Sequence, residues 1–303
     1  MARVGIMHSG SQNVDGPNVT ALQNRLTTDC KGAIDYAGTP LYASGQSLLT
    51  LAKQLLSANP PLDILVAAGG SRSADAAIKA RGNAKTPIIV FTSVAPYILN
   101  GLDLTTTTGV CAHTSDHDVA RLKWLTQMPL PGNRIGVLIN SDRGDKDKQI
   151  ADLKNAAGTA GNNWTLRPRD IKIDKTLKES FNWLHGDIHA LVVAADPVFN
   201  ENRQELVNRA TAEKYPAIFQ WREFVDLGGL MSYGPNIARL YDQAGAMTAS
   251  ILNATANSPY KIWEPSDPND FELVVNRSTA QSIQNMWPLP LTVAGFKNLV
   301  VIP

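Results

Sequence analysis

The sequence has no strong charge imbalance and no long hydrophobic run. Its 303 residues carry a formal net charge of +1 at pH 7. A chain so close to neutral has neither the basic field that attracts nucleic acid nor an acidic tail. No apolar run approaches the ~20 residues that a membrane-spanning helix needs. We therefore expect no nucleic-acid partner and no membrane-spanning helix.

Cysteine is scarce, and a secretory signal is missing from the start of the sequence. The two cysteines, Cys30 and Cys111, lie far apart in the sequence, and buried free thiols are favoured over a disulfide, although the two could pair. Met1-Ala2-Arg3 leads directly into Val4–Met7, which is shorter than the apolar segment of a signal peptide. This absence does not by itself place the protein in the cytosol.

The common signatures of nucleophilic catalysis and of phosphate binding are also absent. The sequence contains no G-x-S-x-G segment and no Cys-His signature. The segment GGSRSAD, residues 69–75, precedes a predicted helix but lacks the Lys-Ser or Lys-Thr ending of a P-loop and the spacing of G-x-G-x-x-G. The sequence therefore gives little support to an enzyme, and we expect no cofactor.

One stretch, HTSDH at residues 113–117, has the composition of a metal site. His113 and His117 are four residues apart with Asp116 between them, a set that could bind zinc if all three lay on one helix. A helix capped by Thr114 or Ser115, with Asp116 in its first turn, accounts for the same residues more simply. We therefore expect no metal.

What the sequence does contain is a regular alternation of short apolar runs and helix-period stretches. The runs predict strands at Arg3–Ser9, Ala33–Tyr36, Asp63–Ala68 and Pro87–Phe91, then again at Arg134–Asn140, Trp164–Pro168, His189–Ala194 and Ala217–Phe219. Helices are predicted between them at Asn18–Leu26, Ser47–Leu56, Ser71–Arg81, Asp147–Ala157, Leu177–Leu184 and Asn202–Glu213. Near-continuous apolar strands separated by helices indicate a parallel sheet covered on both faces.

The alternation occurs twice, so the sequence predicts two α/β halves. With 303 residues, 44% of them hydrophobic, the chain is large enough for two domains. The β-branched segment 104–115 lies between the halves and could pass from one to the other. After the second half come a long predicted helix, Arg239–Leu252, and a strand, Phe271–Asn276. If Ser232–Pro235 and Glu272–Asn276 also cross, both domains are discontinuous.

Polar and aromatic residues follow the predicted strands, where ligands of open α/β sheets bind. The candidate ligand-binding residues of the first half are Ser9, Gly10, Ser11, Gly70, Ser71, Arg72, Ser73, Thr92 and Ser93. Those of the crossing stretch and the second half are Thr114, Ser115, Asp116, Asp142, Asp196, Phe199, Trp221, Arg222 and Tyr233.

Two groups among these candidates suggest which chemical groups of a ligand the protein binds. Ser71 or Ser73 would cap the helix that follows, and the free N–H groups there would bind an anion such as a carboxylate, with Arg72 nearby. A simple cap on a glycine turn is the alternative. Phe199, Trp221 and Tyr233 could form an aromatic wall for a ligand, with ordinary core packing as the alternative.

Several segments resemble one family closely. WREFVDLGGLMSYGPN, YDQAGAMTASIL and FELVVNRSTAQSI, between residues 221 and 283, resemble the C-terminal signature of a family of ABC-transporter substrate-binding proteins, sometimes called TrpX-like. RVGIMHSG, LDILVAAGG and PIIVFTSV stand where that family has strands. The resemblance covers nearly the whole chain and is strongest from about residue 191 to about residue 282.

The resemblance implies a type I periplasmic-binding fold, an α/β fold with two doubly wound parallel-sheet lobes joined by three crossover segments. Residues 1–113 and about 236–270 would form the N-terminal lobe, and about 114–235 and about 271–303 the C-terminal lobe, with the ligand cleft between them. It also implies an exported, periplasmic or extracytoplasmic protein, its signal peptide removed or omitted from this chain. Such a protein is a monomer, has no enzymatic activity and delivers a small molecule to an ABC permease.

The expected class of ligand follows partly from the resemblance and partly from two positions at which this sequence differs from the family. Relatives bind amino acids, including aromatic ones, and often carry Gly-Asp-Pro after the fourth strand. Here residues 93–96 read Ser-Val-Ala-Pro, without the acid. If that acid binds a ligand ammonium group, then Asp116, Asp142 or Asp196 takes over, or the ligand has no amine. Arg72 replaces a small residue and favours an anionic ligand, so the expected ligand is an amino acid or an aromatic acid.

Two other functions stay open. A ligand-binding sensory domain of the same fold could signal to a membrane receptor. Because the first strand is predicted to begin at Arg3, a version with a preceding helix-turn-helix is disfavoured, and a partner sensor kinase stays open. A small-molecule hydrolase using Asp142 or His113 ranks third, because no coherent catalytic constellation accompanies either residue.

Overall fold

The chain folds into two compact units. The computed structural model describes residues 1–43, 47–112, 117–140, 146–159, 163–171, 179, 185–267, 270–283 and 286–303. Unit 1 consists of Met1–His113 and Ile237–Ser266, and unit 2 of Thr114–Asn236 and Asp267–Pro303. The chain therefore passes between the units three times, after residues 113, 236 and 266.

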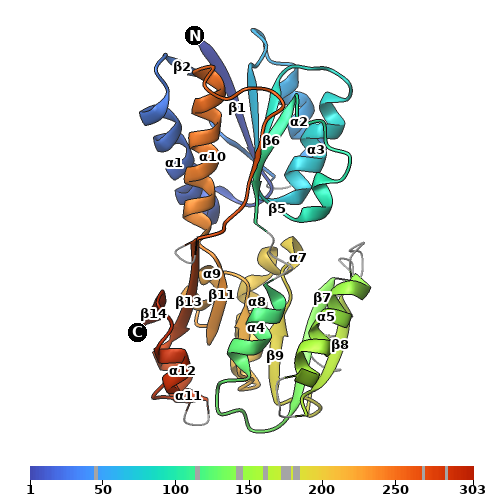
Figure 1. Cartoon of the computed structure of the whole chain (residues 1–303), viewed down its shortest axis with the longest axis vertical. Helices are drawn as coiled ribbons and strands as arrows, with labels where there is room; N and C mark the ends of the chain where they lie inside the picture. Colours follow the sequence, from blue (N-terminus) through green and yellow to red (C-terminus); the bar gives the residue numbers. More distant parts are fainter. Residues whose placement is uncertain are drawn as a thin grey trace. The chain divides into compact units, whose positions relative to one another are not determined.

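Unit 1 contains a parallel sheet in the order β12-β6-β5-β4-β1-β2, with β3 paired to β1 (Figure 1). Its strands are β1 (Ala2–His8), β2 (Ile34–Tyr36), β3 (Leu41–Tyr42), β4 (Ile64–Ala68), β5 (Ile88–Val94), β6 (Thr107–Cys111) and β12 (Ile262–Trp263). Its helices are α1 (Gln12–Asp29), α2 (Leu48–Leu56), α3 (Ser71–Arg81), the short 3-10 helix η1 (Pro96–Leu99) and α10 (Ile237–Leu252).

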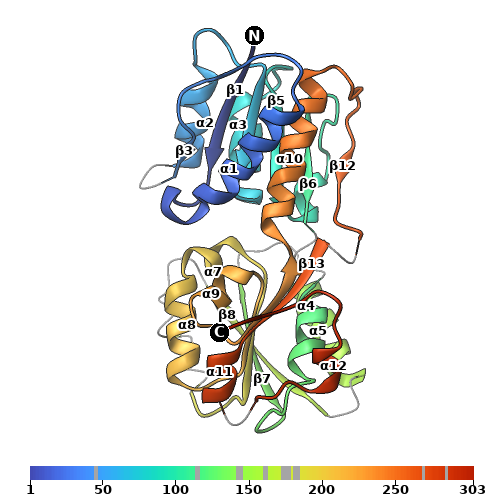
Figure 2. The same ribbon diagram turned by 90° about the vertical axis from the view of Figure 1, so that its left-hand side faces the viewer.

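Both faces of this sheet are covered, because its central strands are apolar on both sides. Every residue of β4 is buried. One face packs against α1 and α10, which contribute Val19, Leu22 and Leu240, and the other packs against α2 and α3, which contribute Leu55 and Ala77 (Figure 2). The periodic leucines of α1 and α2 thus point to opposite faces of one sheet, as a doubly wound fold requires.

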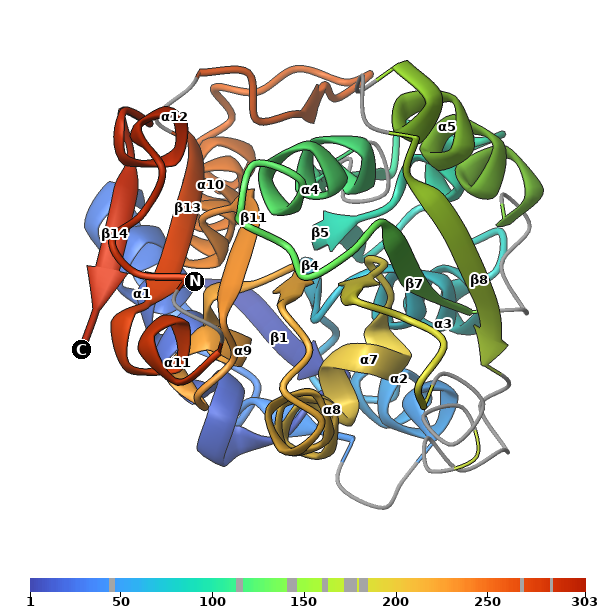
Figure 3. The same ribbon diagram turned by 90° about the horizontal axis from the view of Figure 1, so that it is seen from below.

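Unit 2 contains a second sheet in the order β14-β13-β11-β10-β9-β7-β8. Its strands are β7 (Arg134–Asn140), β8 (Thr165–Ile171), β9 (Ala190–Val193), β10 (Ala217–Phe219), β11 (Met231–Pro235), β13 (Phe271–Asn276) and β14 (Leu299–Ile302). All neighbours pair in parallel except β11 and β13, which are antiparallel. Figure 3 shows β13 between β11 and β14.

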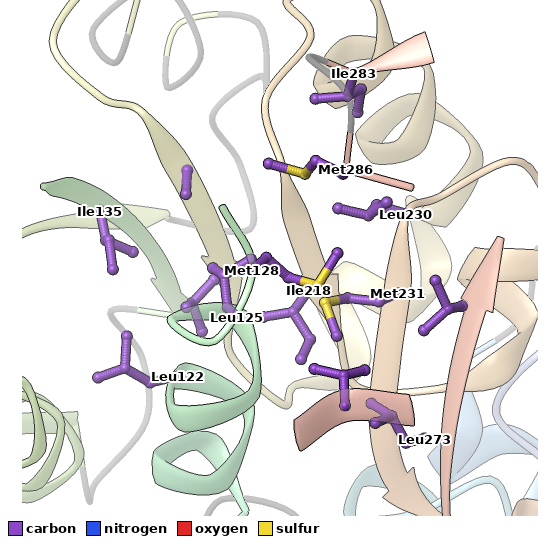
Figure 4. Close-up of a cluster of buried hydrophobic side chains, with 14 of the residues drawn as sticks. Leu122, Leu125, Met128, Ile135, Ile218, Leu230, Met231, Leu273, Ile283 and Met286 are labelled. Carbon is purple, nitrogen blue, oxygen red and sulfur yellow. The ribbon is translucent and has the colours of Figure 1, made fainter. Parts of the chain in front are cut away.

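Helices cover both faces of the second sheet. On one face lie α4 (Asp118–Leu125), α5 (Lys146–Thr159) and α12 (Leu291–Ala294), and on the other α7 (Pro197–Glu201), α8 (Arg203–Ala212) and α9 (Arg222–Asp226). Helix α11 (Arg277–Ser282) follows β13, and its Thr279 hydroxyl donates to the Gly228 carbonyl just after α9. Figure 4 shows the first core, where Leu122 and Leu125 of α4 pack near Ile218 and Met231 of the sheet. Among the described residues, no helix is long and apolar enough to cross a membrane.

The predicted α/β class with two mostly parallel sheets is confirmed. The segment 104–115 differs in detail, because Thr107–Cys111 forms β6 inside unit 1 before the chain leaves it. The antiparallel strand β13 follows from connectivity: β11 leaves unit 2 at residue 236 and the chain returns at 267, so β13 runs back along it. The predicted helix Leu177–Leu184 lies outside the described residues, apart from position 179.

The parallel strands of each sheet point the same way, and the side of the sheet at which they end is here called the carboxyl edge. This side is the one that concerns the candidate site. The chain leaves unit 1 just after β6 and returns to it at the start of α10. Tyr241 of α10 forms a hydrogen bond with His8 at the end of β1. The chain leaves unit 2 just after β11. The chain passages therefore lie at the carboxyl edges, where open α/β sheets bind ligands.

Candidate ligand-binding site

A glycine turn joins the ends of three neighbouring strands at the carboxyl edge of unit 1. Gly69 and Gly70 follow β4 with φ angles of 87° and 90°, in a region that residues with a Cβ rarely adopt. The Ser9 hydroxyl donates to the Gly69 carbonyl at 2.6 Å, and the Gly69 N–H donates to Thr92 Oγ1 at 3.1 Å. The turn therefore fixes the ends of β1, β4 and β5 against one another.

Helix α3 begins directly after this turn, and its cap differs from the predicted one. Gly70 occupies the N-cap position, so neither Ser71 nor Ser73 does. The Ser71 hydroxyl instead accepts a hydrogen bond from the Ala95 N–H at 2.9 Å. Ser73 lies on the third residue of α3, and its hydroxyl is fully buried with no hydrogen-bond partner in the described part of the chain.

Two further predicted residues flank this helix start. Arg72 is exposed on the first turn of α3, and Ser93 at the end of β5 has a φ angle of 46°. The N–H groups of a helix's first turn have no partner within the helix, and the helix dipole adds a partial positive charge there. The start of α3 is therefore suited to an anion.

The end of β1 carries a buried histidine that the sequence analysis did not single out. The Gly10 N–H donates to His8 Nδ1 at 2.8 Å, so that nitrogen carries no proton. His8 Nε2 lies 2.6 Å from the Tyr241 hydroxyl oxygen and must therefore be the protonated, donating nitrogen. Burial lowers the pKa of His8, while the nearby Asp15 carboxylate acts in the opposite direction. The neutral ring is thus held in one tautomer.

Helix α1 begins beside this histidine. Ser11 occupies its N-cap position, and the Ser11 N–H donates to Asp15 Oδ2 at 3.0 Å. The same Asp15 oxygen lies 3.9 Å from His8 Nδ1. Gly10 and Ser11, both predicted from the sequence, therefore lie beside a carboxylate that was not predicted.

At the carboxyl edge of unit 2, two predicted residues have clear structural roles. The Asp196 side chain is buried and accepts from the Val198 N–H at 2.9 Å, which caps α7. The Gln220 side-chain amide donates to the Asp196 carbonyl at 3.2 Å. Phe199 is fully buried in the core beneath α7, α8 and α9.

Trp221 and Arg222 do not lie on a strand. Strand β10 ends at Phe219. The rule that neighbouring residues of a strand point to opposite faces of the sheet therefore does not apply to this pair. Trp221 occupies the N-cap position of α9 and packs, partly exposed, against the same core as Phe199. Arg222 opens α9, and its guanidinium lies 3.4 Å from the Asp226 carboxylate.

Tyr233 lies on β11, inside an aromatic cluster on the opposite face of the sheet. Its ring stacks on Phe271 at a centroid distance of 6.2 Å and an angle of 16°. Phe296 and Trp124 lie 5.9 and 6.1 Å away. Burial raises the pKa of the Tyr233 hydroxyl. The proposed aromatic wall is therefore divided, with Trp221 on one face and Tyr233 on the other.

A buried ionic network near Tyr233 was also not foreseen. Arg121 and Asp118, one turn apart on α4, form an ion pair with side chains 0% and 1% exposed. Asp118 also accepts hydrogen bonds from the Gln149 amide of α5 and, at 3.2 Å, from the Ala195 N–H. An apolar periodicity search cannot detect such a pair, because both residue types usually lie on the surface.

Four predicted residues, Thr114, Ser115, Asp116 and Asp142, lie outside the described residues, as does His113. Helix α4 begins at Asp118 with His117 at its N-cap position, so the helix start predicted at Thr114 or Ser115 is wrong. The His117 ring packs edge-on against Phe271 at 4.7 Å. The described ranges contain no group of three or more His, Cys, Asp or Glu residues able to hold a metal ion.

Comparison with known proteins places this architecture in a family. Residues 16–293 match the family described as ABC transporter substrate binding protein. The chain belongs to this family, whose members are extracytoplasmic substrate-binding proteins. No curated protein sequence matches it.

Solved structures share the fold. An ABC domain from Streptococcus pneumonia in complex with L-Trp is 18% identical and superposes with a TM-score of 0.77, covering 99% of this chain and 100% of that one. A ligand-free substrate binding protein with adhesive properties from Clostridium difficile is 20% identical, with a TM-score of 0.68 and coverages of 100% and 99%. The leucine binding protein LivK from Thermotoga maritima is 9% identical, with a TM-score of 0.60 and coverages of 84% and 81%. The fold is of the type I periplasmic-binding class.

Proposed function

We propose that this protein is the extracytoplasmic receptor of an ABC importer. It would bind a small carboxylate-bearing molecule, an amino acid or an aromatic acid, at the carboxyl edges of its two units. Loaded with ligand, the monomeric protein would deliver it to a permease in the membrane. Membership of the substrate-binding family supports this proposal, and so do the bound L-Trp of one structural neighbour and the leucine named for another.

The observation that carries the ligand class is the start of α3. A fully buried hydroxyl, that of Ser73, has no hydrogen-bond partner among the described residues. An unsatisfied buried hydroxyl costs about 1–3 kcal/mol, so its presence calls for a reason. It lies on the first turn of a helix whose N-terminus already favours an anion. A ligand carboxylate would satisfy both groups at once.

Unit 2 would contribute an aromatic surface. Trp221 lies two residues after β10 and is partly exposed, which leaves part of its side chain available to an apolar ligand group. Arg222 beside it is exposed as well. We also propose that the protein does not transform its ligand, because Ser9, Ser71 and Asp196 at the two carboxyl edges bind backbone groups instead of forming a nucleophile paired with a base.

The experiment that tests this function begins with the purified protein. Mass spectrometry of what co-purifies would identify a retained ligand, and a thermal-shift screen would cover amino acids and aromatic carboxylic acids. A ligand present at 100 times its dissociation constant stabilises the native state by about 2.7 kcal/mol, a shift that such a screen detects. If no compound of either class binds, the proposal fails, and if a bound compound is converted, the protein is an enzyme.

A further inference from the structure

Asp15 carries a negative charge at the carboxyl edge of unit 1 without a cationic partner. Its side chain is 13% exposed, and its hydrogen-bond partner in the described chain is the Ser11 N–H, at 3.0 Å. The nearest basic group is His8 Nδ1 at 3.9 Å, which accepts a hydrogen bond from Gly10 and therefore bears no proton. No lysine or arginine of the described residues lies within ion-pair distance of Asp15.

Two aromatic rings lie near His8, the basic group nearest to this carboxylate. The centroids of the Tyr42 and Tyr241 rings are 5.5 and 5.9 Å from that of the His8 ring. Tyr42 ends β3, which pairs with β1 at His8, and it is partly exposed. Burial raises the pKa of the Tyr42 hydroxyl, and the Asp15 charge acts in the same direction. A carboxylate beside an aromatic face is the combination that attracts an ammonium group.

The helices that carry the carboxylate and the anion site, α1 and α3, follow two neighbouring strands. Strand β1 pairs directly with β4, and His8 is in register with Ala68, the last residue of β4. Neighbouring strands are about 4.8 Å apart. The Ser9 hydroxyl bridges the two strand ends through its hydrogen bond to Gly69. The negative site and the anion site therefore follow adjacent strands, at the carboxyl edge where open α/β sheets bind ligands.

Glycine at position 10 allows the carboxylate to come this close. A Cβ atom on Gly10 would lie 2.0 Å from Asp15 Oδ2 and 3.2 Å from His8 Cε1. Any other residue there would displace the carboxylate from the edge of the sheet. Of the acids that the sequence suggested for a ligand ammonium group, Asp196 caps α7, and Asp116 and Asp142 lie outside the described residues.

We propose that Asp15, together with the ring of Tyr42, binds the ammonium group of the ligand, so that the ligand is an amino acid rather than an aromatic acid without an amine. The proposal rests on the proposed function and narrows it. Asp15 would take the role of the acid missing from residues 93–96, from the end of β1 instead of the end of β5. Ser71, Ser73 and the start of α3 would bind the carboxylate of the same molecule.

The test compares matched ligands on the native protein and on a variant that keeps the hydrogen bond. The amide oxygen of Asp15→Asn can still accept from the Ser11 N–H, so this change removes the charge and leaves the helix cap. The probes are L-tryptophan, L-phenylalanine and L-leucine, each paired with its analogue lacking the amine. Asp29→Asn, at the other end of α1 in an exposed ion pair with Arg25, is the control.

The native protein should bind at least one amino acid about tenfold or more tightly than its analogue, since a hydrogen bond to a charged group contributes about 1.5–3 kcal/mol. Asp15→Asn should remove most of that preference, whereas Asp29→Asn should keep it. The comparison on native protein does not depend on the variant's folding. If the analogues bind as tightly as the amino acids, the ammonium site is refuted while the proposed receptor function stands. If neither probe class binds, both fail.

Discussion

The guanidinium of Arg121, which has no exposed surface, donates from Nε to the carbonyl oxygen of Tyr233 at 2.7 Å. Tyr233 lies on β11, three residues before the chain passes to unit 1, and Arg121 lies on the first helix after the chain enters unit 2. Asp118, the ion-pair partner of Arg121, accepts a hydrogen bond from the N–H of Ala195, two residues after β9. One buried pair therefore fixes three backbone segments at the carboxyl edge of unit 2.

Replacing Arg121 with methionine should destabilise the protein strongly. The change leaves the buried Asp118 carboxylate without its counter-charge and the Tyr233 carbonyl without its donor. Breaking a buried pair in this way costs about 3–5 kcal/mol. Urea denaturation followed by tryptophan fluorescence measures the loss. The control is Arg25→Met, whose side chain is 43% exposed in an ion pair with Asp29 and should cost less than about 1 kcal/mol. Similar losses for both variants would contradict a structural role for the buried pair.

Ser71 and Ser73, two residues apart on α3, should respond oppositely to alanine. Ser71→Ala leaves the Ala95 N–H without its acceptor and should destabilise the ligand-free protein by about 1–3 kcal/mol. Ser73→Ala removes a buried hydroxyl that has no partner in the described chain, so stability should stay the same or rise slightly. Thermal denaturation without ligand measures both effects. A clear loss of stability in Ser73→Ala would show that the hydroxyl has a structural partner, and the anion-site argument would lose its main support.

The free energy of unfolding should depend on the ionisation of His8. Its pKa is lowered by burial from the ordinary 6.5, so the unfolded chain binds a proton at a higher pH than the folded protein does. As the pH falls below about 6.5, protonation therefore favours the unfolded state, and the native protein loses stability until the folded-state pKa is passed.

His8→Gln should show a smaller loss than the native protein when denaturation curves at about pH 7.5 and about pH 5.5 are compared. The other histidines are the same in both proteins, so the difference between the two curves isolates His8. An equal loss in native protein and variant would mean that His8 has the same proton affinity folded and unfolded.

Trp221→Ala and Arg222→Ala should each weaken ligand binding while leaving the fold intact. Both side chains lie at the start of α9 beside the carboxyl edge, and each is at least partly exposed. A reduction of about tenfold corresponds to about 1.4 kcal/mol and is measurable by calorimetry with the best ligand of the screen. Leu227→Ala, 37% exposed at the other end of the same helix, is the matched control and should bind normally. Unchanged affinity in both variants would remove α9 from the site.

Much of the fold was predictable because its signals are local. The apolar run Arg134–Asn140 forms β7 with the predicted bounds, and Ser71–Arg81 forms α3. The buried residues of β7 are nearly continuous in the sequence and those of α3 recur at helical spacing, so these patterns predict the strand and the helix. The short helix α9 was missed, because five residues carry too few apolar positions to show a period and because Arg222 looks like a residue that follows a strand.

The site was less predictable because its residues act through long-range contacts. The strand-end rule led to Ser9, Ser71 and Trp221, which lie at or near the carboxyl edges, since the rule depends on strand positions alone. It did not lead to Asp15, whose proposed role depends on the paired ends of β1 and β3 and on the approach that Gly10 permits. Nor could it distinguish Ser71 from Ser73, because their difference lies in one N–H group, that of Ala95.

The sequence by itself determined the α/β class, the two sheets and the family, because apolar periodicity and short signature segments are properties of the chain. The tertiary structure decided which side chains meet. Whether a carboxylate, a hydroxyl or a guanidinium has a partner depends on groups many residues away, such as Tyr241 for His8 and Tyr233 for Arg121. Burial then makes each pairing matter energetically, as it does the absence of a partner for the Ser73 hydroxyl in the described part of the chain.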